Sequence, residues 1–366
     1  ITFKSGGTTG APKYSVFTHA EFRAFTQVFG AGIRRAGLQP GERIGNLFYA
    51  GRLYASFLFI CRSIEAAGAG ICYPIGGSDL DEALACWRQF GLTTLAGVPT
   101  TLMTLIGQMS EQDRRTLKLR KFLYGGEPMF ADQIAALRRV FPDCEVRSVG
   151  IAGVDYGELG WAAAGQAQGV HHCFDESTIV EILDEDSGET IHATGTAGRL
   201  VVTNLQRRLM PIIRYPVGDR GEWLDAPGTP ARRFRVLGRT EDGARVGPMT
   251  LYVEDIQELL AKWARAEGGV PLQSFQLCID HDAGRDRCRL RVAVDAPEQL
   301  GDAHAQRLRE LVYAERHLFA DLVAGALVHP LLVEWVRPQG LLINPRTGKL
   351  RRVVDTRHAT AQPAKP

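Results

Sequence analysis

The sequence has few of the features that mark disulfide-rich, zinc-ribbon or membrane-spanning proteins. Its 366 residues include seven cysteines, which are odd in number, scattered along the chain and without a CxxC pair. This usage argues against a disulfide framework or a ribbon-type zinc site, and we expect a reducing, cytoplasmic location. No apolar run reaches the roughly 18 residues that span a bilayer, because the stretch 47–64 is interrupted by Gly51, Arg52 and Arg62.

The chain also has no excess of charge of one sign. The 43 basic and 41 acidic residues leave a formal net charge of +2, so no long-range field is available to attract nucleic acid or an anionic membrane. We therefore expect a small-molecule partner, with no nucleic acid and no membrane among the partners. The first residue is Ile1 rather than Met, and a glycine-rich motif follows within a few residues, which predicts that an N-terminal piece is missing.

The distribution of apolar residues predicts two domains. Up to residue 149, short apolar runs alternate with amphipathic stretches, which is typical of parallel strands joined by crossover helices. The sequence from 178 to 236 is rich in strand patterns and predicts a β-rich subdomain. After Gly238 the order strand, helix, two strands, helix, strand predicts a small α+β module of the βαββαβ type. The expected boundaries are a large α/β domain over 1–238, a hinge over 239–242, a small mobile domain over 243–358 and a tail over 359–366.

The spacing of apolar residues gives approximate bounds for these elements. We predict helices near 22–35, 54–67, 80–90, 100–109, 131–140, 253–266 and 303–318. We predict strands near 43–48, 70–73, 94–96, 121–124, 145–149, 275–280, 287–294 and 331–336.

The strongest chemical signal is the segment from Ser5 to Lys13, SGGTTGAPK. Its three glycines let the backbone approach an anion, while three hydroxyls and one ammonium group supply ligands for the anion's oxygens. The segment therefore predicts a phosphate-binding loop. It differs from the GxxxxGK[ST] loop in its glycine spacing, and because neither Ser nor Thr follows Lys13.

Further motifs follow along the chain: YGGEP at 124–128, GIAGVDYGE at 150–158, RYPVGDRG at 214–221, GRTEDG at 238–243 and NPRTGKLRR at 344–352. Together with the first segment, and in this order, they resemble the signatures of the acyl-adenylate-forming (AMP-binding) superfamily, in particular its phenylacetate–coenzyme A ligase branch. The resemblance covers nearly the whole chain. It implies ATP, Mg²⁺ and coenzyme A as cofactors.

The resemblance also implies roles for individual residues. Arg239 and Lys349 are the catalytic candidates, with Lys349 as the mobile cation of the first half-reaction and Arg239 reaching the ribose. Glu241 stands at the pivot of the hinge. Nucleotide contacts are implied for Ser5, Gly6, Gly7, Thr8, Thr9, Gly10 and Lys13 of the first segment, for Gly125, Gly126 and Glu127 of the adenine-binding turn, and for Asp219 and Arg239 at the ribose.

The metal ligand depends on how the segment 150–158 is aligned with the family motif. The family usually has Tyr-Gly-x-Thr-Glu here, and we align Ile151 with the Tyr, Val154 with the Thr and Asp155 with the acid. Asp155 is thus the predicted Mg²⁺ ligand, since this ion prefers oxygen donors. Glu158 is the competing candidate.

Aromatic residues mark a candidate acyl pocket. The residues concerned are Phe48, Tyr49, Gly51 and Tyr54. In relatives that activate α-amino acids an Asp stands near the place of Tyr49, so its absence favours an acid without an α-amine. The ordinary alternative is that these rings belong to the core.

The function that the resemblance implies is ATP-dependent activation of an aromatic or arylacetic acid to acyl-AMP, followed by thioester formation with coenzyme A. The alternatives are an adenylation enzyme that loads a phosphopantetheinyl carrier protein, an acyl-protein synthetase, and a non-catalytic nucleotide-binding regulator. His171 and Cys173 share one face of a predicted strand and are potential zinc ligands. No second ligand pair stands at a useful spacing, which favours a packed or substrate-facing histidine.

Overall fold

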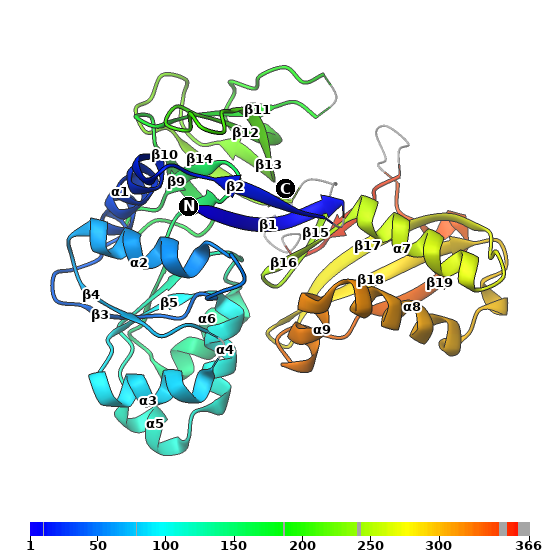
Figure 1. Cartoon of the computed structure of the whole chain (residues 1–366), viewed down its shortest axis with the longest axis horizontal. Coiled ribbons are helices and arrows are strands. Elements are labelled where there is room, and N and C mark those ends of the chain that lie inside the picture. Colours follow the sequence, from blue (N-terminus) through cyan, green and yellow to red (C-terminus); the bar gives the residue numbers. More distant parts are fainter. Residues whose placement is uncertain (10, 78, 186, 240–242, 344–349, 358–366) are drawn as a thin grey trace, which may run out of the picture. The chain divides into compact units, whose positions relative to one another are not determined.

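The computed structural model in Figure 1 describes residues 1–9, 11–77, 79–185, 187–239, 243–343 and 350–357. The chain divides into two compact units, Ile1–Ser5 with Lys13–Leu237 and Gly6–Pro12 with Gly238–Pro366. The expected hinge pivot and tail fall on residues outside the described part, so both stay predictions. None of the helices in the described ranges is long and apolar enough to cross a membrane.

The first unit contains a five-stranded sheet in which every pairing is parallel. The strand order is β4-β3-β5-β6-β7, so the order reverses at β3. The strands are short and flanked by helical segments, as expected for crossover units. Their bounds are β3 Arg43–Asn46, β4 Ile71–Pro74, β5 Thr94–Gly97, β6 Lys121–Tyr124 and β7 Glu145–Ser148.

Helices cover both faces of this sheet, which gives two separate apolar layers (Figure 1). Ile44, Ala96 and Leu123 pack with the buried residues of α1 and α2. Leu95 and Phe122 pack with those of α3, α4 and α6 on the other face. The helices are α1 His19–Arg35, α2 Ser56–Ala67, α3 Leu80–Phe90, α4 Pro99–Gln108, α5 Glu111–Thr116 and α6 Ala131–Val140.

A seven-stranded sheet follows in the same unit, with the order β11-β12-β13-β14-β10-β9-β8. It begins at Ile151, earlier than the predicted β-rich stretch, because the residues from 150 to 161 form a short hairpin that lacks clear alternation. Its strands are β8 Ile151–Gly153, β9 Gly157–Trp161, β10 Val170–Cys173, β11 Thr178–Leu183, β12 Ala197–Asn204, β13 Ile212–Trp223 and β14 Arg233–Arg239.

The glycine-rich segment at the N-terminus differs from the expected loop. Most of it lies in β1 Thr2–Thr9 and β2 Ala11–Val16, which pair as a two-stranded sheet. Two backbone hydrogen bonds between Ile1 and Phe17 close the base of this pair. Phe3 and Phe17 are buried in the core beside α1, which anchors the strands at that end.

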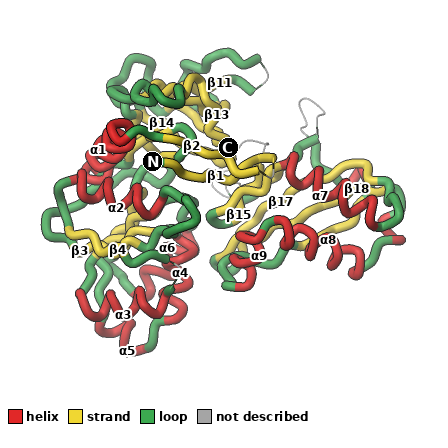
Figure 2. Tube along the Cα trace, viewed as in Figure 1, coloured by secondary structure: helices red, strands yellow, loops and turns green. Residues whose placement is uncertain are grey.

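The second unit is an α+β module with its own core, and Figure 2 shows its helices and strands. Its four-stranded sheet has the order β19-β18-β17-β20, and alternate residues of β18 face the core formed with α7 and α8. The elements are β15 Gly243–Val246, β16 Met249–Tyr252, α7 Val253–Ala266, β17 Leu272–Asp282, β18 Arg285–Val294, α8 Asp302–Glu315, α9 His317–Ala324, β19 Leu332–Val336 and β20 Val353–Asp355.

This module is richer than the βαββαβ pattern that the sequence predicts. Its first strand is a separate hairpin of β15 and β16, and the fourth place in the sheet is taken by β20, which runs parallel to β17. The helix expected over 303–318 is broken at Arg316, whose backbone leaves the helical conformation (φ −126°, ψ 65°). Its guanidinium lies 2.8 Å from the buried carboxylate of Asp255, which fixes the break.

Candidate nucleotide and acyl site

The carboxyl ends of the parallel strands gather several of the predicted site residues. In open parallel sheets, ligands bind outside these ends, where the strand order reverses. Phe48 follows β3, and the turn Gly125–Glu127 follows β6. The Gly125 N–H donates to the Gly97 carbonyl over 3.3 Å. A Cβ on Gly125 would lie 2.6 Å from Val149 and 3.5 Å from the Phe48 ring, so only glycine fits in this turn.

The rest of the YGGEP turn is also tightly specified. Gly126 has φ +81°, a conformation that residues with a Cβ rarely adopt. The Glu127 carboxylate accepts a hydrogen bond from the N–H of Thr100, in the first turn of α4. A carboxylate at this position satisfies an N–H group that the helix leaves without an internal partner. The turn is thus held both by its glycines and by a helix cap.

The aromatic segment, residues 48–54 after β3, exposes some of its rings and buries others. Phe48 is only 5% exposed and belongs to the core, whereas Tyr49 is 39% exposed. The Tyr49 and Tyr54 rings meet edge to face, with centroids 5.6 Å apart. The ammonium group of Lys4 lies 5.3 Å from the Tyr54 ring centroid. Tyr49 and Tyr54 are therefore the candidates with accessible aromatic surface.

The backbone of this segment is strained. Gly51, Arg52 and Leu53 all have positive φ, at 93°, 49° and 64°. For a residue with a side chain this conformation costs on the order of 1–3 kcal/mol, and it persists only where the surroundings impose it. Such strain clusters at ligand-binding segments, which supports a binding role for the loop.

Asn46, at the end of β3, links the two ends of the loop that contains the aromatic segment through hydrogen bonds of its side chain. Its side chain is fully buried. The Asn46 Oδ1 accepts from the Phe48 N–H over 3.0 Å, and its Nδ2 donates to the Phe57 carbonyl over 3.1 Å. One carboxamide thus ties together the two ends of the loop that bears Tyr49 and Tyr54.

Asp155 lies in the turn between β8 and β9, where its side chain is half-buried. The hydroxyl of Ser15 donates to its Oδ1 over 3.0 Å, and the Tyr215 hydroxyl lies 3.5 Å from its Oδ2. The Asp155 turn therefore contacts both β2, which contains the end of the glycine-rich segment, and the RYPVGDRG segment. Hydroxyl and carboxylate oxygens are donors that suit Mg²⁺.

Glu158, the competing metal candidate, lies inside the protein. It is 1% exposed, and its Oε2 accepts from the Asn204 Nδ2 over 3.3 Å. Burial raises the pKa of its carboxyl to about 7, against the opposing effects of hydrogen bonds and of Arg207. The Arg207 guanidinium donates to the Val16 carbonyl over 3.2 Å and lies against the Phe17 ring.

The RYPVGDRG segment places Asp219 in a bulge of β13. The pairing runs from Arg199 opposite Arg220 to Val201 opposite Pro216, so β13 contains two more residues than β12 across this stretch. Gly218 has φ +80°, which permits the irregularity. Bulges of this kind redirect side chains and occur often beside active sites. Asp219 is half-buried there.

Several predicted residues lie outside the described part, in whole or in part. These are Gly10, Glu241 and Lys349, together with the side chains of residues 5–12 and of Arg239, whose backbone ends β14. Lys13 is described and is exposed. The roles predicted for these residues stay predictions.

The two flanks of the Lys349 motif are described and are held together. Ile343 and Leu350 form an isolated antiparallel bridge. The fully buried Gln276 of β17 donates from its Nε2 to the carbonyls of Leu342 and Arg351, at 3.0 and 2.6 Å. A side chain of β17 thus holds the backbone on both sides of the NPRTGKLRR loop.

His171 packs in the interior. Its ring stacks on Phe234 with centroids 5.8 Å apart, and its Nε2 lies 3.3 Å from the Ser148 hydroxyl. Burial lowers the pKa of its imidazole to about 4. Among the described residues, no group of three or more His, Cys, Asp or Glu is arranged to hold a metal ion. The burial of His171 and Cys173, and the contact of His171 with Phe234, support the packed interpretation.

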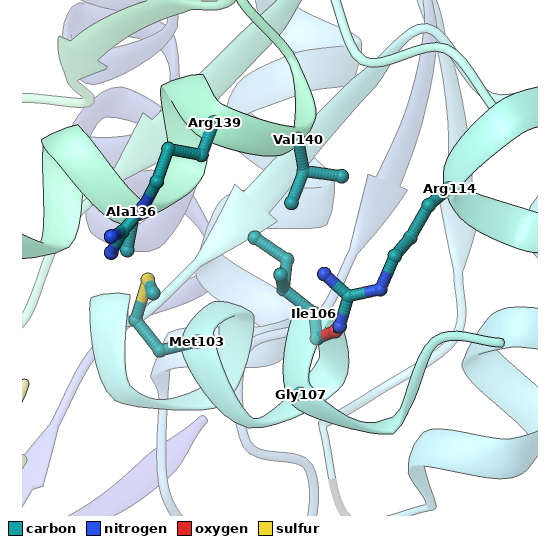
Figure 3. Close-up of a pocket in the computed structure, with 7 residues that line it drawn as sticks. All are labelled: Met103, Ile106, Gly107, Arg114, Ala136, Arg139 and Val140. Carbon is teal, nitrogen blue, oxygen red and sulfur yellow. The ribbon is translucent and has the colours of Figure 1, made fainter. Parts of the chain in front are cut away.

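A cleft of about 490 Å³ lies between α4 and α6, apart from the predicted residues (Figure 3). Figure 3 shows Met103 and Ile106 of α4 and Arg139 and Val140 of α6 around it. Arg114 donates to the Ile106 carbonyl over 2.7 Å and so caps the end of α4. None of the residues that line this cleft belongs to the motifs, so the cleft does not support the predicted binding roles of those motifs.

The sequence did not single out several residues that contact the predicted ones. Tyr215 belongs to the RYPVGDRG motif, four residues before Asp219, and this position was the signal that could have found it. Ser15, Asn204 and Arg207 carried no signal, because their contacts with Asp155 and Glu158 arise only when distant strands meet.

Comparison with known proteins defines the class. The family model described as "AMP-binding enzyme" matches residues 5–206, more than half of the chain, and the chain belongs to this family. Within it, the chain falls in the phenylacetate–coenzyme A ligase-like branch. It is 26% identical to the phenylacetate–coenzyme A ligase of Thermus thermophilus over 368 residues, covering 96% of this chain and 80% of that protein. The Escherichia coli ligase of the same name is 24% identical over 330 residues, covering 87% and 71%.

Solved structures show the same fold. A 2-hydroxyisobutyryl-CoA ligase in complex with its acyl-AMP and coenzyme A has a TM-score of 0.69 at 20% identity, covering 98% of this chain and 74% of that chain. An amide bond synthetase from Marinactinospora thermotolerans has a TM-score of 0.60 at 18% identity, covering 96% and 67%.

Proposed function

We propose that the chain activates an aromatic or arylacetic acid with ATP and then forms its coenzyme A thioester. The observation that carries the proposal is the contact between two motifs of the AMP-binding family, in which Tyr215 of RYPVGDRG meets Asp155. The relatives in the same branch are named phenylacetate–coenzyme A ligases, which supports both the acid and the thiol.

In the first half-reaction a carboxylate oxygen of the acid attacks the α-phosphorus of ATP, and the bond to the pyrophosphate leaving group breaks. The product is acyl-AMP, a mixed anhydride. In the second, a thiolate attacks the acyl carbon and AMP leaves. Two anions must approach one another in the first step, so catalysis rests on positioning and charge neutralisation.

Residues of the first unit, together with Arg239 of the second, supply binding and orientation. Within the Gly125–Glu127 turn, Gly126 is exposed and has no Cβ, so a flat adenine ring can approach the backbone there. Asp219 accepts hydrogen bonds from the ribose hydroxyls, and Arg239 is proposed to reach the same sugar. Asp155 would hold Mg²⁺, whose charge neutralises the phosphates, and its oxygen-rich surroundings fit that ion.

Lys349 is proposed to neutralise charge in the first half-reaction only, with residues 239–242 as the hinge that moves it away for the second. Lys349→Ala should slow adenylate formation on the order of 100- to 1000-fold, or roughly 2.7–4 kcal/mol. Thioester formation from supplied acyl-AMP should be unchanged. Lys262→Ala is the control, since Lys262 is an exposed lysine of the same unit that pairs with Glu315. Equal loss of both steps would contradict the assignment.

The proposed substrate class is tested by pyrophosphate release with benzoate, phenylacetate, anthranilate, octanoate, phenylalanine and leucine. We expect an aryl or arylacetic acid to react best and the amino acids worst, because an α-ammonium group would lose hydration without a partner. Preference for phenylalanine or leucine would overturn the proposed pocket. Preference for octanoate would favour an acyl-protein synthetase, which a cysteine-bound acyl group surviving gel separation would identify.

The thiol acceptor is tested separately, with coenzyme A and with a phosphopantetheinyl carrier protein offered to the preformed acyl-AMP. We expect coenzyme A to be acylated. All seven cysteines of the chain are free thiols, and a reducing cytoplasm is the compartment that we propose for the reaction.

A further inference from the structure

Two cysteines behind the aromatic segment form a close thiol pair. Cys61 of α2 and Cys72 of β4 place their Sγ atoms 3.9 Å apart, with the Cys72 thiol donating toward Cys61. Both side chains are half-buried rather than sealed in the core. A disulfide has an S–S length of about 2.05 Å, so the two sulfurs must come closer together for a bond to form.

The surroundings of the pair favour Cys61 as its nucleophile. Asn46 Nδ2 donates to the Cys61 Sγ over 3.1 Å, so two donors point at this sulfur. The hydrogen bond from Cys72 lowers the pKa of the Cys61 thiol, with further help from Asn46 and the neighbouring Arg62, whereas the pKa of Cys72 is raised. Thiolate character determines the reactivity of a cysteine.

We propose that Cys61 and Cys72 are a peroxide-reactive dithiol that closes reversibly to a disulfide. The Cys61 thiolate attacks one oxygen of a hydroperoxide, the O–O bond breaks, and water or an alcohol leaves after protonation. Cys72 then attacks the sulfenic sulfur of Cys61 and displaces a second oxygen as water. Two thiols lose two electrons and two protons, and one peroxide is reduced. A dithiol reductant restores the pair.

Oxidation acts on the aromatic segment through Asn46. The carboxamide that donates to Cys61 also holds the Phe48 N–H and the Phe57 carbonyl, at 3.0 and 3.1 Å. A disulfide sulfur is a weaker acceptor than a thiolate, so closing the bond removes one of the contacts that orient this carboxamide. The ends of the loop bearing Tyr49 and Tyr54 then lose part of their support.

The modification is tested by treating the full chain with hydrogen peroxide and analysing its peptides by mass spectrometry. We expect a Cys61–Cys72 cross-linked peptide pair that dithiothreitol dissolves. In Cys72→Ser, Cys61 should instead carry a sulfenic acid that dimedone traps. Cys86 is the internal control, because its half-buried thiol lies 3.4 Å from the Glu82 carboxylate and its pKa is raised. Cys61 should react at least about tenfold faster than Cys86, and equal rates or no cross-link would overturn the proposal.

The coupling is tested by hydrogen–deuterium exchange of the reduced and oxidised chain. Peptides covering 47–57 should exchange faster after oxidation, and Cys61→Ser should abolish that response while Cys86→Ser keeps it. A change confined to α2 and β4 would show that the disulfide forms without reaching the aromatic segment. Both measurements use neither ATP nor acid, so they are independent of the proposed function.

Discussion

Two carboxylates only three residues apart, Asp155 and Glu158, occupy opposite environments. Asp155 stands in the β8–β9 turn, half-buried, with the hydroxyls of Ser15 and Tyr215 beside it. Glu158 stands within β9, is 1% exposed, and burial raises the pKa of its carboxyl. Both residues are carboxylates, so residue type alone does not separate them. Their positions relative to the turn decide which carboxylate can meet a ligand.

The boundary between the two environments is Gly157. It has φ +92°, and a Cβ there would lie 2.3 Å from the Asn204 Nδ2. The chain can therefore turn sharply at Gly157 and enter the buried strand β9 in close contact with Asn204. Residues before Gly157 belong to the turn, and those after it belong to the interior.

The strongest test of this comparison is Asp155→Asn. We expect adenylate formation to fall on the order of 100- to 1000-fold, or roughly 2.7–4 kcal/mol, comparable to the loss of one preorganised electrostatic partner. The concentration of Mg²⁺ needed for half-maximal rate should rise as well. Glu158→Gln is the matched control and should leave the Mg²⁺ dependence unchanged. If the two variants exchange these effects, the alignment of the motif is wrong.

Glu158 should instead affect stability and its pH dependence. Its carboxyl has a pKa of about 7 in the folded protein against an ordinary value of 4.5, so the folded state binds its proton more tightly. The contribution of the protonated Glu158 to the free energy of unfolding is complete below about pH 4.5 and is lost as the pH rises through 7. The loss is at most roughly 3.5 kcal/mol, from a difference of about 2.5 pKa units at about 1.4 kcal/mol per unit.

The measurement is denaturant unfolding of the wild type and of Glu158→Gln at pH 5.5 and pH 8.5. The variant keeps an acceptor for Asn204 and carries no titrating group. It should therefore be more stable than the wild type at pH 8.5, and its free energy of unfolding should change much less between pH 5.5 and pH 8.5. Parallel pH profiles for both proteins would show that this carboxyl does not titrate as its burial suggests.

Asp219→Ala should have a smaller effect, on binding. We expect the KM for ATP to rise about tenfold or somewhat more, since a hydrogen bond to a charged group contributes about 1.5–3 kcal/mol. The KM for the acid and the rate at saturating ATP should change little, because a ribose contact serves ground and transition states alike. Initial rates over a matrix of both substrates separate these quantities. An unchanged KM for ATP would show that the bulge in β13 has another purpose.

Much of the fold followed from the sequence, because regular apolar spacing reports burial directly. The bounds predicted for 80–90, 121–124, 131–140 and 253–266 are those of α3, β6, α6 and α7. Elements without such spacing were missed. The three residues of β20 are too few to form a pattern, and the break between α8 and α9 depends on the ion pair of Arg316 with Asp255.

The local structure of the site was predictable where a motif specifies a backbone turn, as at Gly125, since glycine patterns report turns. It was not predictable where the environment arises from strands that are distant in sequence. Spacing alone left Asp155 and Glu158 as rivals, and only the fold shows that Asn204 and Arg207 approach Glu158. The close thiols of Cys61 and Cys72 likewise depend on α2 packing beside β4.

The aromatic segment shows the same contrast between a buried and an accessible residue, because Phe48 is 5% and Tyr49 39% exposed. A change at Tyr49 has the smallest expected effect. Tyr49→Leu should raise the KM for the arylacetic substrate about 2- to 13-fold, since a favourable ring pair contributes roughly 0.5–1.5 kcal/mol beyond its buried area. The KM for octanoate should hardly change, because a linear chain gains nothing from ring geometry. Phe90→Leu is the matched control, being 38% exposed and packed against Tyr73 with ring centroids 5.1 Å apart. Equal shifts for both acids, or for both variants, would mean that Tyr49 acts only through general packing and that the acyl group is recognised elsewhere.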